Sequence, residues 1–469
     1  MTATLPSTPV TVTDGSTTTG ADFADLATRM TGRLATPADA DWNQVRSAWN
    51  LAVDQRPDAV ALVADVADVQ VVLAVATATG RRVVPQGTGH NASPLGDLSG
   101  TILIRTDRLR DVLIDPARRS ARIGAGVVWG EVVAAAAQHG LTALAGSSAD
   151  VGVVGYTLGG GFSWFARSKG VAANHVTAIE LVTGDGVFRR ISATCDPELF
   201  WAVRGGGGNF GVVTAMEFAL FERQMAYAGA LFFPIERARE ILVAYREWTA
   251  DLSEAATTSV RLLRVPPMPE LPEPLRGKAF VVVNGVIDLP ADQAAALLAP
   301  LRERGPVVDM FAPMPTAALA MVHMDPPQPV PGAGDGLNLA NLSDPVIDRL
   351  LEIAGPQVER CPFLTVDLRQ LGGAAGRSVP GGGVVDHFSG EYLLFAVGMA
   401  PTPEIAAQVH EAATGMVTAL QPYSAPRDYL NFRERAVDPA SIWGSDLVKL
   451  RAIRAAVDPS GILRANHCI

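Results

Sequence analysis

The sequence of 469 residues has little cysteine, no excess of positive charge and no long apolar run. Its three cysteines are widely spaced and odd in number, which suggests neither a disulfide framework nor a metal site. With 38 basic against 48 acidic side chains the net charge is −10, which argues against nucleic acid as a partner. No uninterrupted apolar run reaches the ~18 residues of a membrane span.

The N-terminal segment also lacks the features of a secretory leader. Residues 1–23 are rich in Thr and Ser, with no basic start and no apolar core. We therefore expect these residues to form a disordered or loosely attached tail, and residues 1–36 together to form the tail and the lead-in to the first domain. A soluble, cytoplasmic protein in a reducing compartment is expected, without a membrane anchor.

Apolar residues make up 48% of the chain, enough to fill two cores in a sequence too long for one. From residue 37 to 222, short β-branched runs alternate with alanine-rich helical patterns. Residues 58–85 predict a strand, a helix that ends at Gly80, and a second strand. Further strands are expected within 100–106, 111–126 and 178–192, the last with an Asp-Gly hairpin turn.

The composition changes after residue 222, where Pro-rich loops begin to separate apolar strands. An antiparallel sheet with helices on one face is expected over 223–425. Residues 426–469 predict a helix that ends at an Asp-Pro pair, followed by a short tail. The strands are expected at 278–288, 363–373 and 391–400, and the helices at 291–304 and 343–355.

The stretch "VVPQGTGHNAS", residues 83–93, places a histidine in a glycine loop at the end of a strand. Gly87 and Gly89 could simply make a tight turn in which His90 hydrogen-bonds its own loop. Alternatively, the glycines admit a phosphate to the backbone while the imidazole reaches a reactive ring. The loop alone leaves both interpretations open.

Three further stretches restrict the choice. Residues 146–170 carry glycines at 152, 155, 159, 160 and 161, a density that lets backbone N–H groups line a flat or anionic ligand. Neither GxGxxG between strand and helix nor GK[ST] is present, so this is neither a Rossmann fingerprint nor a P-loop. The third stretch is "DPELFWAVRGGGGNFGVVTAMEF", residues 196–218. The fourth is "YLNF" with the terminal "RANHCI".

Together the four stretches resemble the berberine bridge enzyme-like FAD-linked oxidases of the vanillyl-alcohol oxidase superfamily, in particular the bacterial branch that includes 6-hydroxynicotine oxidase and antibiotic-biosynthesis oxidases. The resemblance covers about residues 37–469 and is weakest over 223–425. It implies an α+β fold with a two-part FAD-binding domain, 37–222 and 426–469. An inserted substrate-binding domain built on the antiparallel sheet would occupy 223–425.

The resemblance implies that His90 is bound covalently to the 8α-methyl group of FAD. Gln86 stands where arginine is common, and Thr88 replaces a glycine, so the fit of the loop is expected to differ. Ser148 occupies the position of a second, cysteinyl tether, and serine cannot form that thioether. A single covalent bond is therefore expected, and Cys195, Cys361 and Cys468 are expected to be small buried apolar residues.

The same resemblance gives Val151 a role in controlling the access of dioxygen to the flavin, with ordinary packing as an equal alternative. Other flavin contacts are implied over the glycine-rich stretches and the C-terminal motif, with backbone groups supplying much of the binding. The implied contacts are Gln86, Gly87, Thr88, Gly89, Asn91, Ser147, Ser148, Val151, Gly152, Gly155, Tyr156, Gly160, Gly161, Asn209, Gly211, Val213 and Asn431.

On the substrate side, Phe432 stands where relatives often carry a tyrosine. Strand alternation places Thr365, Asp367 and Arg369 on one face. Asp367 could act as a base if burial raised its pKa, or it could form a pair with Arg369 that only holds the sheet. Tyr429 and His387 are further catalytic candidates, although a lone histidine is often structural.

These inferences predict an FAD-dependent oxidase. Hydride passes from an alcohol or amine carbon of a small molecule, of a secondary-metabolite kind, to covalently bound flavin, and O2 is the acceptor that gives H2O2. Two alternatives remain: an oxidative cyclase that closes a ring or forms a C–C bond, and a non-catalytic flavin-binding protein.

Overall fold

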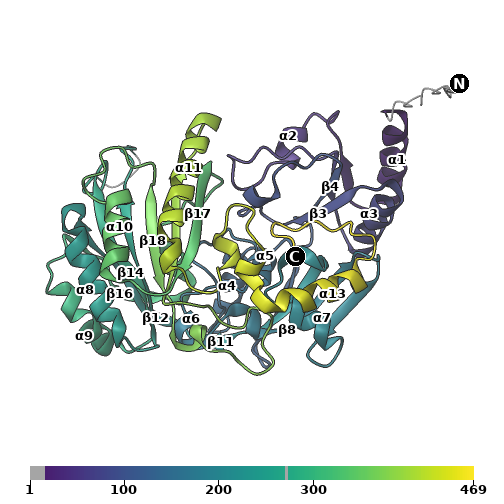
Figure 1. The fold of residues 1–469 in the computed structure, drawn as a ribbon. Coiled ribbons are helices and arrows are strands. Elements are labelled where there is room, and N and C mark those ends of the chain that lie inside the picture. The colour runs from purple at the N-terminus through teal and green to yellow at the C-terminus, as the bar shows by residue number, and fades with distance from the viewer. Residues whose placement is uncertain (1–15, 270–272) are drawn as a thin grey trace, which may run out of the picture.

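Two groups of β-sheets lie side by side and form the frame of the protein, with the C-terminal segment running back across them (Figure 1). The computed structural model describes residues 16–269 and 273–469. The first group contains a four-stranded and a five-stranded sheet, and the second is one eight-stranded sheet. This mixed arrangement of sheets and helices confirms the predicted α+β class.

The four-stranded sheet has the order β1-β2-β4-β3, and it carries the chain to the glycine loop. Strands β2 and β3 both pair parallel with β4, because helix α3 crosses between them. Asp65 caps the first turn of this helix, and Gly80 ends it in a left-handed conformation with φ 68°. The elements are β1 (Arg33–Ala35), β2 (Ala59–Leu62), α3 (Val66–Thr79), β3 (Arg82–Gln86) and β4 (Thr101–Arg105).

The N-terminal lead-in is more ordered than expected. Residues 1–15 of the predicted tail lie outside the described residues, but helix α1 begins at Ser16 and ends at Arg29. Leu26 and Met30 are buried in the core formed with α3. The expectation of a tail that extends to residue 23 is therefore wrong over the helical part. A short helix α2 (Trp42–Val45) follows.

The five-stranded sheet is antiparallel, in the order β5-β6-β10-β8-β9. The predicted Asp-Gly turn joins β8 to β9, with Gly186 at φ 77°. A two-stranded ribbon of β7 and β11 leads to the second group of sheets. The elements are β5 (Val112–Asp115), β6 (Ser120–Gly124), α4 (Trp129–Ala137), β7 (Leu141–Thr142), α5 (Val153–Leu158), α6 (Ala166–Lys169), β8 (Val176–Thr183), β9 (Phe188–Ser192), α7 (Pro197–Val203), β10 (Gly211–Ala219) and β11 (Phe221–Glu222).

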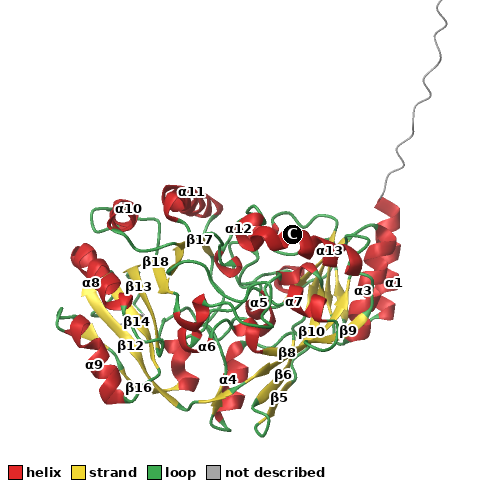
Figure 2. Cartoon of the chain, turned by 60° about the horizontal axis from the view of Figure 1, so that its bottom comes forward, coloured by secondary structure: helices red, strands yellow, loops and turns green. Residues whose placement is uncertain are grey.

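The eight-stranded sheet is antiparallel throughout, and helices α8, α9, α10 and α11 cover one of its faces (Figure 2). This confirms the architecture expected for residues 223–425. The strands are β12 (Met225–Pro234), β13 (Ala256–Arg264), β14 (Ala279–Ile287), β15 (Val308–Asp309), β16 (Ala312–Pro315), β17 (Gly332–Leu339), β18 (Thr365–Gln370) and β19 (Tyr392–Met399). The helices are α8 (Ala238–Ala250), α9 (Ala291–Arg302), α10 (Asp344–Ala354) and α11 (Pro403–Leu420).

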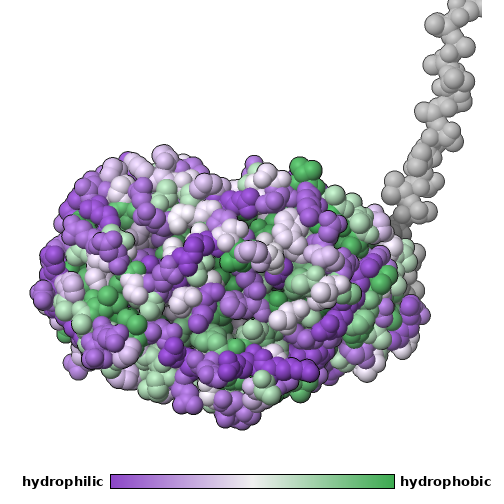
Figure 3. All heavy atoms as spheres, turned by 90° about the horizontal axis from the view of Figure 1, so that it is seen from below, coloured by the Kyte–Doolittle hydropathy of each residue, from purple (hydrophilic) through white to green (hydrophobic). Residues whose placement is uncertain are grey.

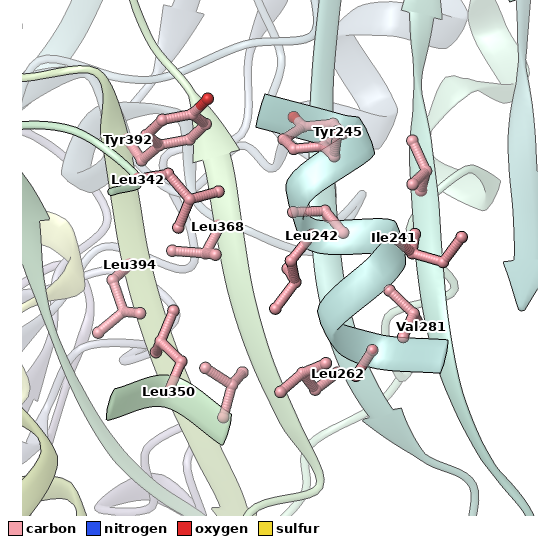
Figure 4. Packing of buried hydrophobic residues seen from close by; sticks show 14 of the residues in the cluster. Ile241, Leu242, Tyr245, Leu262, Val281, Leu342, Leu350, Leu368, Tyr392 and Leu394 are labelled. Atoms are coloured by element: carbon pink, nitrogen blue, oxygen red, sulfur yellow. The ribbon is translucent and has the colours of Figure 1, made fainter. Parts of the chain in front are cut away.

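Along the central strands β13 and β18, alternate side chains point toward the helices and the others point away from them. Leu262 of β13 and Leu368 of β18 lie in the apolar layer beside Leu242 of α8 (Figure 4). Each such side chain contributes about 1.5–3 kcal/mol when fully buried. Because strand side chains alternate, the neighbours Arg261 and Asp367 point to the opposite face of the sheet. That opposite face meets the first group of sheets.

The C-terminal segment returns to the first group of sheets. Helices α12 (Ala440–Trp443) and α13 (Leu447–Val457) precede a tail in which Leu463 pairs with Val83 of β3. The side chain of Asn209 holds the tail. Its Nδ2 donates to the carbonyl of His467 at 2.8 Å, and its Oδ1 accepts from the backbone N–H of Ile469 at 3.3 Å.

On the face shown in Figure 3, apolar side chains form small patches among hydrophilic ones. No helix in the described part of the chain is both long and apolar enough to cross a membrane. Cys195 and Cys468 are exposed, and Cys361 is half-buried. The expectation of three buried cysteines is therefore wrong, because Cys195 lies in a surface turn and Cys468 is the penultimate residue.

Candidate active site

A cavity of about 470 Å³ lies between the glycine-rich loops of the first group of sheets and the polar face of the eight-stranded sheet. Its size is in the usual range for small-molecule sites. The C-terminal return of the chain closes part of the wall. The main lining segments are 85–91, 146–148, 151–158, 207–213, 323–326, 364–369, 395–399, 429–434 and 466–467.

The glycine loop presents His90 to this cavity. Strand β3 ends at Gln86, and Gly89 then turns the chain with φ 83°, a conformation that favours glycine. The imidazole stacks on Trp49 with ring centroids 3.9 Å apart. Its Nε2 lies 3.3 Å from the carbonyl oxygen of Asp150 and 3.4 Å from the Oδ1 atom of the same residue. The ring is therefore held at Nε2, which leaves Nδ1 as the nitrogen for a further bond.

Asp150 is the anchor for this arrangement. It accepts hydrogen bonds from Trp49 Nε1 at 2.5 Å and from Ser148 Oγ at 2.8 Å. Burial acts to raise the pKa of Asp150, but the hydrogen bonds from His90, Ser148 and Trp49 outweigh it and lower that pKa. An ionised Asp150 thus fixes the orientation of the His90 ring.

The glycines of the cavity wall leave room for a flat ligand close to the backbone. A Cβ atom at Gly155 would meet no atom within 4 Å, and at Gly87 and Gly152 the nearest atoms would be 3.8 and 3.5 Å away. Gly161 differs, because a Cβ there would lie 2.5 Å from Tyr156. The wall glycines therefore offer open backbone, whereas Gly161 allows a tight turn with φ 82°.

Most of the predicted cofactor contacts lie together on the cavity wall. Gly160, Gly161 and Asn209 do not line it: the two glycines form the turn after α5, and Asn209 holds the C-terminal tail. The predicted residues on the wall are Gln86, Gly87, Thr88, Gly89, His90, Asn91, Ser147, Ser148, Val151, Gly152, Gly155, Tyr156, Gly211, Val213 and Asn431.

A buried cluster of charged side chains forms the opposite wall. Asp367 Oδ2 accepts from Arg369 Nε at 2.7 Å and lies 3.2 Å from His323 Nε2. The other ring nitrogen of His323 lies 2.7 Å from Asp325 Oδ1, and Asp325 Oδ2 accepts from Ser147 Oγ at 2.8 Å. The cluster therefore joins the eight-stranded sheet to the glycine-rich loop of the first group.

The pKa of Asp367 moves in the opposite direction from the one that a base would need. Burial acts to raise it, but the charges of Arg369 and His323 outweigh burial and hold the pKa of Asp367 well below its usual range. The condition for Asp367 to act as a base, a raised pKa, is therefore not met, and the alternative of a pair with Arg369 is the one that the structure contains. The expectation that Thr365, Asp367 and Arg369 share one face holds, since all three line the cavity.

The two other catalytic candidates are placed differently. Tyr429 lines the cavity, but burial raises its pKa to about 12, and its Oη accepts from Asn431 Nδ2 at 2.8 Å and from the Phe162 N–H at 3.2 Å. It stays a neutral phenol that positions Asn431. His387 lies outside the cavity wall, with its Nδ1 2.6 Å from Asp386 Oδ1.

Several buried polar atoms of the wall have no hydrogen-bond partner among the described residues. Such atoms are rare in folded proteins and call for a ligand or water. Their number, with the open glycine backbone and the exposed edge of the His90 ring, fits a large polar cofactor such as FAD. They are Asn91 Oδ1, Arg261 Nε and Nη2, Thr365 Oγ1, Asp367 Oδ1, Glu434 Oε2 and His467 Nδ1.

Glu434 provides a test of the electrostatics of this wall. Burial and the nearby charge of Asp335 raise the pKa of Glu434 to about 8. Between about pH 4.3 and 8 the folded protein keeps a proton that the unfolded chain releases, so stability falls as the pH rises, by up to about 1.4 kcal/mol per pH unit. We expect Glu434→Gln to remove this slope in urea unfolding at pH 5, 6, 7 and 8.

The exposed Glu352 of α10, paired with Arg349, serves as the matched control for this substitution. Glu352→Gln is expected to leave the slope unchanged. Equal slopes for the unmutated protein and Glu434→Gln would show that the Glu434 carboxyl is ionised in the folded state.

Comparison with known proteins extends these observations. Residues 57–192 match the model of an FAD binding domain. The chain is 25% identical over 460 residues to the uncharacterized FAD-linked oxidoreductase YgaK of Bacillus subtilis, covering 94% of this chain and 97% of that protein. It is 32% identical over 240 residues to (R)-6-hydroxynicotine oxidase of Paenarthrobacter nicotinovorans, which covers 51% of this chain and only 49% of that enzyme.

Structural similarity to solved proteins extends over nearly the whole chain. The solved structure of BBE-like 1 from Physcomitrella patens superposes with a TM-score of 0.83 at 18% identity, covering 95% of this chain and 98% of that one. The chain therefore contains an FAD binding domain and has the fold of the berberine bridge enzyme-like proteins. The cavity lies where this FAD binding domain meets the eight-stranded sheet.

Three side chains of the cavity wall are not predicted from the sequence, namely Arg261, His323 and Asp325. His323 and Asp325 lie in an irregular Pro-rich loop that has no periodicity from which to assign a face. Arg261 had a usable signal, because Ser259 and Arg261 alternate with Val260 and Leu262 along β13. Polar residues at every second position of a buried strand point to a lined cavity.

Proposed function

We propose that this protein oxidises an alcohol or amine carbon of a small-molecule substrate, using FAD bound covalently through His90 and O2 as the acceptor that becomes H2O2. The observation that carries the proposal is that His90 and the Asp367 cluster face the same cavity. A redox cofactor held on one wall and hydrogen-bonding groups on the other are the elements that such a reaction needs.

The residues of the first group of sheets would hold the cofactor. We assign residues 37–222 and 426–469 to the FAD-binding domain and 223–425 to the substrate-binding domain. When bound, FAD supplies the acceptor for the hydride of the substrate. The backbone of the wall glycines accommodates it, and Asp150 keeps His90 in position for the bond through Nδ1.

The opposite wall would orient the substrate. Asp367 is ionised at neutral pH, and its Oδ1 atom has no partner among the described residues, so it accepts a hydrogen bond from the hydroxyl or amine that is oxidised. Arg369 and His323 occupy Oδ2 and fix the plane of the carboxylate. The role of Asp367 is therefore to position the reacting group rather than to store its proton.

Anaerobic mixing with a panel of alcohols and amines tests the proposal. Bleaching of the flavin absorbance with at least one compound, followed by recovery in air with one H2O2 per flavin, is the expected result. A ring-closed product would identify an oxidative cyclase. No bleaching with any compound would favour a non-catalytic flavin-binding protein.

Val151 offers a test of the oxygen half of the reaction. It lines the cavity between Asp150 and Gly152, and its small side chain leaves space that a longer one would fill. We expect Val151→Leu to slow reoxidation in air about tenfold or more, while substrate reduces the flavin at a similar rate. Rapid mixing follows the two half-reactions separately.

The control is Val187→Leu, which makes the same substitution at an exposed valine outside the cavity wall. It is expected to leave reoxidation unchanged. Equal slowing of both half-reactions in Val151→Leu would show that the residue only packs against the cofactor. Unchanged reoxidation would show that oxygen arrives by another route.

A further inference from the structure

Arg261 on β13 is a buried guanidinium without adequate partners. The residue is 4% exposed and lines the cavity. Its Nη1 makes a long contact of 3.4 Å with His323 Nδ1, while Nε and Nη2 have no hydrogen-bond partner among the described residues. An unsatisfied buried charge is strongly unfavourable, so its retention indicates a role in binding.

The neighbouring carboxylates of Asp325 and Asp367 make no ion pair with Arg261 in the described part of the chain, because their bonded oxygens contact other side chains. Asp367 is its cross-strand partner in register, yet Oδ2 of that residue is taken by Arg369 and His323. The two oxygens of Asp325 are taken by His323 and Ser147. Burial lowers the pKa of Arg261, as expected for a cation that lacks a counterion at contact distance.

The two free donors define the shape of the missing partner. Nε and Nη2 form one side of the planar guanidinium fork, which matches the two oxygens of a carboxylate. A phosphate could use the same fork, but its second negative charge would be repelled by Asp325 and Asp367. A monoanion with two coplanar oxygens fits this surrounding charge best.

We propose that the substrate of this oxidase carries a carboxylate, which Arg261 binds through Nε and Nη2. This inference rests on the proposed function, because it names the substrate class of the same cavity. Asp367, the cross-strand neighbour of Arg261, keeps Oδ1 as an acceptor without a partner among the described residues. The substrate is therefore a hydroxy acid or an amino acid derivative, with the anion on Arg261 and the oxidised hydroxyl or amine on Asp367.

Benzoate and its neutral isostere benzamide test the fork on the flavin-loaded enzyme at pH 7. Each probe is titrated while the visible spectrum of the bound flavin is recorded. Because hydrogen bonds to charged groups are worth about 1.5–3 kcal/mol, benzoate is expected to bind at least about tenfold more tightly than benzamide. Equal affinity for the two probes would overturn the proposal.

Two variants assign this preference to Arg261. Arg261→Met should abolish it, and Arg261→Lys should retain part of it, because lysine keeps the charge but lacks the fork. Arg264→Met is the matched control. Arg264 ends the same strand, donates to the Ala354 and Gly355 carbonyls at 2.8 and 3.0 Å, and lies outside the cavity wall. Arg264→Met should still bind benzoate more tightly than benzamide. If Arg261→Met keeps the same preference for benzoate, the proposal is overturned.

Two further measurements separate the alternatives. Flavin content is determined for each variant, and loss of flavin in Arg261→Met would assign the guanidinium to the cofactor and refute the inference. Anaerobic reduction is then compared for hydroxy acids and their amides. If the neutral amides reduce the flavin as fast as the hydroxy acids do, the inference of a carboxylate substrate is refuted, while the proposed oxidase activity is retained. If benzoate binds in an Arg261-dependent manner but no compound reduces the flavin, the proposed oxidase function is refuted instead.

Discussion

Acid precipitation of the purified protein is expected to leave the flavin on the polypeptide, and His90→Ala is expected to release all of it. The physical reason is the placement of the imidazole. Trp49 stacks on one face, Asp150 holds Nε2, and Nδ1 is left for the bond to the 8α-methyl group. Intact mass measurement should show one FAD added to the unmutated chain and none to the variant.

His387→Ala is the matched control, because this histidine lies outside the cavity and pairs with Asp386. It should keep the covalent flavin. His90→Ala should still bind some flavin noncovalently, since the wall glycines remain. Peptide mapping should find flavin on the His90 peptide alone, and recovery of all flavin in the supernatant of the unmutated protein would contradict the prediction. An adduct on Cys195, Cys361 or Cys468 would contradict the single bond.

Asp367→Asn should have the second large effect, because it removes one charge from a buried group of four. Arg369 and His323 lose the carboxylate that both contact, and breaking a buried pair costs about 3–5 kcal/mol. Loss of the substrate's acceptor should slow anaerobic flavin reduction by about 100-fold. Denaturant unfolding and rapid mixing measure the two effects.

The stability effect should depend on pH in a defined direction. Because the folded pKa of Asp367 is depressed, its contribution is present in full above the unfolded value of about 4 and is lost as the pH falls below it. The gap between Asp367→Asn and the unmutated protein should therefore narrow in acid. Asp344→Asn, which alters the exposed pair with Arg246, should cost less than about 1 kcal/mol. Similar costs for the two variants would mean that the buried cluster gains little from its charges.

Local patterns were sufficient to predict several elements of the fold and one face of the cavity wall, whereas most of the other wall residues came from the resemblance to known oxidases. The strand β3 before the loop at His90, the turn at Gly186 and the shared face of Thr365 and Asp367 all depend on interactions between residues near in sequence. Alternation and glycine chemistry act over that range. These features could therefore be predicted without knowledge of the tertiary structure.

Features that depend on distant residues could not be predicted in this way. The pKa of Asp367 depends on His323, which is 44 positions away, and Asp150 reaches Trp49 across 101 positions. Burial alone would raise the pKa of a carboxyl, so the sequence leaves the base and the ion pair as alternatives for Asp367, and the contact with His323 decides between them. His387 shows the converse: a histidine in a glycine-rich segment gives no sign of whether it faces a cavity.

The hydrogen bonds between Asn209 and the C-terminal tail bear on the order in which the protein is synthesised and folds. Asn209 contacts His467 and Ile469, which lie 258 and 260 positions further along the chain, and Leu463 pairs with Val83 of the strand that precedes the His90 loop. The four-stranded and five-stranded sheets of the first group can fold during translation, because all their strands have been synthesised by residue 219. The wall at Asn91 and His467 is complete only when the segment that contains Leu463 and His467 has been synthesised and has packed against the sheets. A cofactor that needs the whole wall is therefore expected to bind late, well after the sheets around it have formed.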